Sequence, residues 1–192
     1  MGSNGIRVDP RLKPVLKDHR RRGGRGPLHW YSGQWIFWGH WPEVFGTAAR
    51  SAEALGDPLL EATQLDYYAW AALLCQGRPR DSFQYSARAL AAARLAGDPV
   101  QEAWAHQYAG WAHCFLGEGT LSSDHDKRAI ALFHVAGDPH GTLQALLQRA
   151  YDLQKAGLNE EALGACQETL DQLEEAGDRV EPHIAEFTRG SA

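Results

Sequence analysis

Apolar positions recur along this chain at an interval of forty residues. The pairs Ala89-Leu90, Ala129-Ile130 and Thr169-Leu170 stand at successive positions of this repeat. A polar break keeps nearly the same register, because Gly-Asp-Pro occurs at 56–58, 97–99 and 137–139, and Gly177-Asp178 follows once more. Two independent markers in one register indicate an internal repeat rather than a coincidence.

Each Gly-Asp-Pro break predicts the end of one helix and the start of the next. Gly accepts the left-handed conformation just past a last helical turn, Asp accepts a hydrogen bond from a free N–H of the next helix, and Pro suits the first helical position. Asp98 and Gln101 also have the spacing of a capping box. Second breaks lie near mid-unit, at Gly77-Arg78-Pro79, Gly117-Glu118-Gly119 and Gly157-Leu158-Asn159. Each unit is therefore expected to be two helices joined by a tight turn.

These breaks predict an all-α fold, a solenoid of helix-turn-helix units. Stacking is required because one helix pair cannot bury its apolar face alone. We expect helices near 58–75, 80–95, 99–115, 122–135, 139–155 and 159–175. A degenerate first unit is expected to have helices at 27–38 and 42–55, and a capping helix is expected at 179–188. The units then cover about 27–55, 56–96, 97–136 and 137–176 of a domain spanning 27–192.

Composition agrees with a helical protein that stays in the cytoplasm. Leu and Ala are abundant while Val and Ile are scarce, which favours helices over strands. The chain has neither a run of eighteen apolar residues nor an apolar signal-peptide core. The three cysteines, Cys75, Cys114 and Cys166, are too widely spaced for a disulfide framework or a zinc site, so we expect reduced thiols.

The net charge of −5 is unevenly distributed. Residues 1–26 contain eight Lys or Arg and two Asp, which leaves eleven basic and twenty-two acidic residues in the remainder. We expect residues 1–26 to be a flexible basic lead-in, with contact to nucleic acid or an acidic surface as the alternative. The acidic body offers no basic stripe for a phosphate backbone, so we expect no direct nucleic-acid binding by the helical domain.

The third full unit resembles a tetratricopeptide repeat, and this resemblance implies a right-handed α–α superhelix. Its bulky, small and turn positions are occupied by Leu146, Ala150, Leu153, Gly157, Ala162 and Leu170. Trp70 departs from this pattern, since it takes the small position of the first full unit. The long period and the Gly-Asp junctions are similar to the C-terminal arrays of bacterial transcription regulators, such as actinobacterial antibiotic-pathway activators. The resemblance implies a sensor or docking array, with nucleotide-binding and DNA-binding domains elsewhere.

The resemblance also places inward-facing residues on the first helix of each pair. They are Gln64, Tyr67, Ala71 and Leu74, then Trp104, Gln107, Trp111 and Cys114, then Gln144, Leu147, Tyr151 and Gln154, with His29 and Ile36 in the degenerate unit. Aromatic rings offer a large contact area, and amides both donate and accept hydrogen bonds. We expect a protein or peptide partner, or a neutral small ligand, at Gln64, Tyr67, Trp104, Gln107, Trp111, Gln144, Leu147, Tyr151 and Gln154. Alternatively, Trp104 and Trp111 simply pack between repeats.

An aromatic cluster precedes the first full unit. It consists of Trp30, Tyr31, Trp35, Phe37, Trp38 and Trp41. We expect it to cap the array, with contact to a neighbouring domain or a second chain as the alternative.

Residue spacing does not predict catalysis or metal binding. His106 and His113 are seven residues apart, whereas paired metal ligands on a helix are better placed three or four apart. His125 has acidic neighbours and Cys114 follows His113, but adjacent helical side chains point apart. We therefore expect a non-catalytic binding module without cofactor or metal. Two alternatives remain: a small enzyme using His106, His113 and the tryptophans around a pocket, and a self-association array such as a homodimer.

Overall fold

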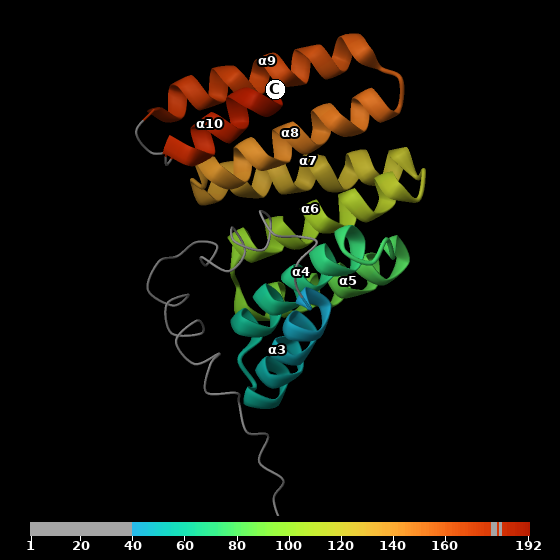
Figure 1. Ribbon diagram of the computed structural model, residues 1–192. Helices are drawn as coiled ribbons and strands as arrows, with labels where there is room; N and C mark the ends of the chain where they lie inside the picture. Colours follow the sequence, from blue (N-terminus) through green and yellow to red (C-terminus); the bar gives the residue numbers. More distant parts are fainter. Residues whose placement is uncertain (1–39, 178–179, 181) are drawn as a thin grey trace, which may run out of the picture.

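The chain folds as a stack of helices placed one upon another in sequence order. A computed structural model describes residues 40–177, 180 and 182–192, and these contain helices and turns but no strand. The helices are α3 (Trp41–Leu55), α4 (Pro58–Leu74), α5 (Pro79–Ala96), α6 (Pro99–Phe115), α7 (Gly119–Ala136), α8 (Pro139–Lys155), α9 (Asn159–Ala176) and α10 (Pro182–Ser191). Figure 1 shows the stack rising from α3 to α9, with α10 lying against α8 and α9.

The stacking is that of an α–α solenoid. Each helix from α3 to α9 packs against the next, and the first helices of the full units also contact one another, α4 with α6 and α6 with α8. The predicted all-α solenoid of helix pairs is therefore confirmed. The largest differences are three residues: α7 begins at Gly119 rather than 122, and α10 spans Pro182–Ser191 rather than 179–188. The predicted helix at 27–38 and the lead-in at 1–26 lie outside the described residues, so their boundary stays a prediction.

The junctions between units form as the Gly-Asp-Pro pattern predicts. Gly56, Gly97 and Gly137 have φ angles of 64°, 66° and 66°, in the left-handed region that favours glycine. Each following Asp accepts a hydrogen bond from a backbone N–H three residues on: Asp57 from Leu60 at 3.1 Å, Asp98 from Gln101 at 2.9 Å, and Asp138 from Gly141 at 3.0 Å. Each helix start is thus fixed within its own first turn.

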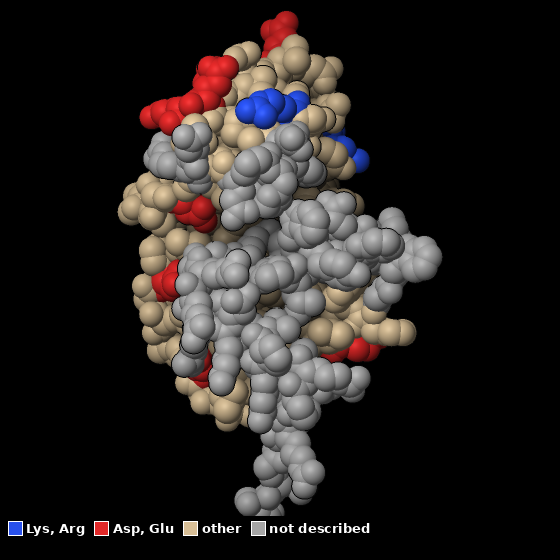
Figure 2. Space-filling model, turned by 60° about the vertical axis from the view of Figure 1, so that its left-hand side comes forward, with Lys and Arg blue, Asp and Glu red and all other residues tan. Residues whose placement is uncertain are grey.

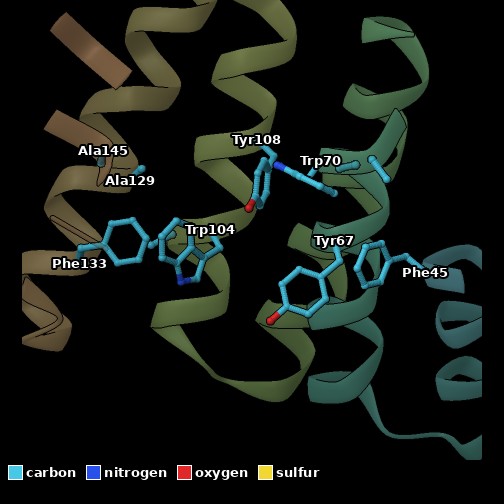
Figure 3. Close-up of a cluster of buried hydrophobic side chains, with 11 residues drawn as sticks. Phe45, Tyr67, Trp70, Trp104, Tyr108, Ala129, Phe133 and Ala145 are labelled. Atoms are coloured by element: carbon cyan, nitrogen blue, oxygen red, sulfur yellow. The ribbon is translucent and has the colours of Figure 1, made fainter. Parts of the chain in front are cut away.

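A large aromatic core runs through α3 to α8 (Figure 3). Tyr67 of α4 packs against Phe45 of α3 with ring centroids 5.2 Å apart, and Trp104 of α6 meets Phe133 of α7 at 4.7 Å. Trp70 lies in the same core, edge-on to Phe45, so the bulky side chain at this usually small position is accommodated between α3 and α4. A separate apolar cluster at the C-terminal end joins Leu143, Leu173, Ala176, Val180 and Ala185.

Two glycines permit the closest contacts between helices. A Cβ at Gly141 would lie 2.2 Å from Cδ1 of Phe133, and a Cβ at Gly110 would lie 2.7 Å from Oδ1 of Asp126. Since ordinary Cβ contacts are longer, glycine is required where α8 approaches α7 and where α7 approaches α6.

In the part of the chain covered by the structure, the length and hydropathy of the helices do not reach what a membrane-spanning helix requires.

Candidate functional site

The nine candidate binding residues lie on α4, α6 and α8, and their exposure increases along the stack. Buried members are Gln64, Tyr67, Trp104 and Gln107. Half-buried members are Trp111, Gln144 and Leu147, and exposed members are Tyr151 and Gln154. The sequence alone did not distinguish these three groups. His29 and Ile36 lie outside the described residues, as does the aromatic cluster apart from Trp41, which stacks on Phe45 at 5.9 Å.

Trp104 contributes to packing between successive units. Its side chain is 4% exposed, meets Phe133 of α7 edge-on, and lies 6.0 Å from the ring of His140 on α8. The cavity beside it has a volume of only about 10 Å³ and is lined by Thr63, Asp66, Tyr67, Gln101, Trp104 and Tyr108. Such a cavity has room for about one water molecule. The described surroundings of Trp104 therefore offer no space for a larger ligand.

The accessible candidates lie on α6 and α8, two first helices that contact each other. Trp111 and Tyr151 hold equivalent positions of successive units, forty residues apart. Phe115, one turn beyond Trp111, is 50% exposed, and Tyr151 is 39% exposed. The Lys155 ammonium lies 5.9 Å from the ring centroid of Tyr151, in the range of a cation–π contact. We call Trp111, Phe115, Leu147, Tyr151 and Gln154 the α6–α8 face. Phe115 was missed in the sequence, although its spacing of four from Trp111 was a usable signal.

Three histidines meet between α6 and α7, which the sequence analysis did not anticipate. Nδ1 of His106 lies 2.9 Å from Nδ1 of His125, and the ring of His113 stacks on His125 with centroids 5.4 Å apart. Nδ1 of His113 also lies 2.6 Å from Oε2 of Glu118. The pKa of both His106 and His125 is lowered to about 4, mainly by burial and secondly by a neighbouring imidazole, which is His125 for His106 and His113 for His125.

A second polar cluster joins α7 to α8. Asp126 and Asp152 share a hydrogen bond, and burial followed by the Asp152 carboxyl raises the pKa of Asp126 to about 8. Burial also raises the pKa of Asp152, although hydrogen bonds from its neighbours oppose the shift. Gln148 Nε2 donates to Asp152 Oδ1 at 2.5 Å, and Ser122 Oγ lies 2.5 Å from Oδ2. The two carboxyl groups therefore hold a proton between them at neutral pH.

The chemistry available to these clusters is limited by access. His106 and Asp126 are each 2% exposed, so a substrate cannot reach them in this conformation. Burial, with a contribution from Asp152, raises the pKa of the Cys114 thiol to about 12, which keeps it protonated and a poor nucleophile. Across the described ranges, no group of three or more His, Cys, Asp or Glu side chains is arranged to hold a metal ion.

A cavity larger than the one beside Trp104 is lined by other residues than those of the two polar clusters. Its volume is about 130 Å³, and it is lined by Phe133, His134, Gly137, Asp138, Pro139, Thr142, Gln172, Glu175 and Ala176. These residues come from α7, α8 and α9 and the α7–α8 junction.

On the face shown in Figure 2, acidic side chains occur along the length of the stack, while the visible Lys and Arg lie near its upper end.

In comparisons with known proteins, neither a protein-family model nor a curated protein matches this chain.

Proposed function

We propose that this chain is a non-catalytic binding module, a tetratricopeptide-like array that docks a protein or peptide partner or holds a neutral small ligand on its α6–α8 face. One observation carries the proposal: Phe115 of α6 and Tyr151 of α8 are exposed aromatic side chains, and Trp111 of α6 holds the repeat position equivalent to that of Tyr151. Exposed aromatic side chains that are held in place by a rigid scaffold are typical anchors of binding surfaces.

The face favours a partner with an apolar anchor and uncharged hydrogen-bonding groups. Trp111 is anchored by Tyr108, whose ring centroid lies 6.3 Å away, so its orientation is fixed before a partner arrives. Gln154 of this face supplies an amide donor and acceptor, as does the half-buried Gln144 on the same helix. The face therefore suits an apolar peptide segment or an uncharged metabolite better than a phosphate backbone.

The repeat supports a regulatory setting for this module. Units of forty residues joined by Gly-Asp are similar to the arrays of bacterial transcription regulators, where such a domain acts as sensor or docking part in the cytoplasm. In that setting DNA contact belongs to another domain, and this acidic array binds the signal or the partner. The enzyme alternative is disfavoured because His106 and His113, the histidines it would use, are buried.

The test is a ligand screen with matched variants. Metabolites and apolar peptides that raise the melting temperature of the wild type are titrated by calorimetry against Trp111→Ala and Tyr151→Ala. We expect each variant to lose affinity by about tenfold or more while keeping its helical circular dichroism. Leu95→Ala is the control, because Leu95 is an exposed apolar residue on α5, outside the face. Unchanged affinity in both face variants would refute the proposed site, and a dimer that dissociates in the face variants would favour self-association.

A further inference from the structure

The hydrogen bond between His106 and His125 ties α6 to α7 and depends on protonation. Its two Nδ1 atoms are 2.9 Å apart, so one must carry a proton and the other must accept it. The two neutral rings therefore hold opposite tautomers, one protonated on Nδ1 and the other on Nε2. An imidazolium carries protons on both nitrogens and therefore cannot accept a hydrogen bond. Protonation of the accepting ring thus replaces this bond with two opposed N–H groups.

The surroundings of the pair add little that would stabilise a positive charge. Glu102 of α6 approaches the pair, with its Oε1 4.0 Å from Nε2 of His106, whereas Glu118 is engaged with Nδ1 of His113 at 2.6 Å. Oε1 of Glu102 already accepts a hydrogen bond from Arg94 of α5 at 2.9 Å. On α7, Arg128 disfavours and Asp124 favours the charged form of His125, while His113 of α6 disfavours it.

Charges on the remaining neighbouring helices act on other groups. On α8, Arg149 and Asp152 face Asp126, and Lys155 acts on Cys114. On α4, Asp66 lines the small cavity beside Trp104. Phe83 of α5 covers His113 with ring centroids 4.6 Å apart, which closes the cluster with an apolar ring.

We propose that His106 and His125 form a proton-operated latch that keeps α6 and α7 together near neutral pH and releases them in mild acid. The device does not depend on the proposed binding function. Release would act on the whole array, because α6 carries Trp104, which packs on Phe133 of α7 and lies near His140 of α8.

The direction of the effect follows from proton linkage. Histidines in an opened segment titrate near 6.5, whereas in the closed form burial lowers the pKa of His106 and His125 to about 4, with a further cause in the neighbouring imidazole included in that value. Between these values the opened form binds more protons than the closed form, so the closed form loses stability as pH falls. One such imidazole raises the opening equilibrium roughly 50-fold between about pH 7 and pH 4.5. Burial raises the pKa of Asp126, so its protonation favours the closed form as pH falls and opposes the effect of the histidines. The effect of the latch is therefore measured as the difference between the wild type and a variant that lacks the two histidines.

Two experiments test the latch. Nitrogen NMR of the wild-type imidazoles at neutral pH should show one Nδ1–H and one Nε2–H tautomer for the pair, with both rings titrating below about 6. Identical Nε2–H tautomers, or midpoints at the ordinary value, would overturn the proposal. This measurement needs no variant.

Hydrogen exchange, corrected for intrinsic rates, provides the second experiment. We compare the wild type with His106→Leu/His125→Leu, and with His134→Leu as control, since His134 is exposed on the same helix α7. The increase of the opening equilibrium of α6 and α7 on acidification should be at least about tenfold smaller in the double variant than in the wild type. The control should show the same increase as the wild type. An unchanged pH dependence in the double variant would contradict the latch; if that variant does not fold, the NMR result decides.

Discussion

The carboxyl groups of the buried Asp126 and the half-buried Asp152 share a proton. An unpaired second negative charge there is costly, because burial penalises the ionised form and no cation lies within bonding distance in the described contacts. The pair therefore makes the stability of the fold depend on pH on the alkaline side, whereas His106 and His125 do so on the acidic side.

We predict that the free energy of unfolding falls between about pH 6.5 and pH 8.5. The folded pKa of Asp126 is raised to about 8, so the folded chain binds more protons than the unfolded chain over this window and loses stability as pH rises. The expected loss is on the order of 1–2 kcal/mol. Urea unfolding of the wild type and Asp126→Asn measures it, and the variant should show a flatter pH dependence. Asp124→Asn, at an exposed neighbour, should behave like the wild type.

At the scale of helices, contact distance is set by small residues as much as by aromatic ones. Gly141 lies in the first turn of α8 directly against the ring of Phe133, which is fully buried on α7. The ring cannot move aside without disturbing its contact with Trp104. A glycine inside a helix is otherwise unfavourable, so its presence here reflects packing rather than backbone preference.

We predict opposite effects for two glycine-to-alanine changes. Gly141→Ala should lower the free energy of unfolding by about 1–3 kcal/mol, because its Cβ would overlap Phe133. Gly164→Ala should raise it by up to about 1 kcal/mol, because Gly164 sits in the middle of α9 with no atom within 4 Å of the added Cβ. Chemical denaturation of both variants checks the prediction. Equal effects would mean that helix propensity, rather than the α7–α8 contact, governs both sites.

At the scale of the whole molecule, a stack of helix pairs is held together by contacts between neighbours. The C-terminal end is closed by α10, whose Ala185 joins Val180 in the apolar cluster with Leu143 and Leu173. In such arrays the loss of an end element exposes the adjacent unit and leaves distant units less affected.

We predict that removal of residues 178–192 destabilises the last full unit first. Loss of Val180 and Ala185 uncovers apolar surface on Leu143 and Leu173 and should cost about 1–3 kcal/mol. Hydrogen exchange should increase in α8 and α9 well before it increases in α4. Removal of 189–192 alone, which are exposed, is the control and should have little effect. Uniform loss of protection along the stack would show instead that the array unfolds as one cooperative unit.

The sequence by itself determined where the helices begin and end and in what order they pair. These features depend on interactions within a few residues, such as the bond from Asp98 to the Gln101 N–H and the left-handed backbone at Gly97. A repeated pattern of such local signals therefore predicts the helix pairs and, because each pair needs a neighbour, the all-α stack.

Only the tertiary structure decided which side chains are accessible and which polar groups meet. Trp104 and Tyr151 both belong to the predicted inward positions, yet one is buried against Phe133 and the other is exposed. His106 and His125 are nineteen residues apart on different helices. Their contact depends on the rotation and register of α6 against α7, which follow from the packing of all intervening side chains and leave no mark in the spacing of either helix.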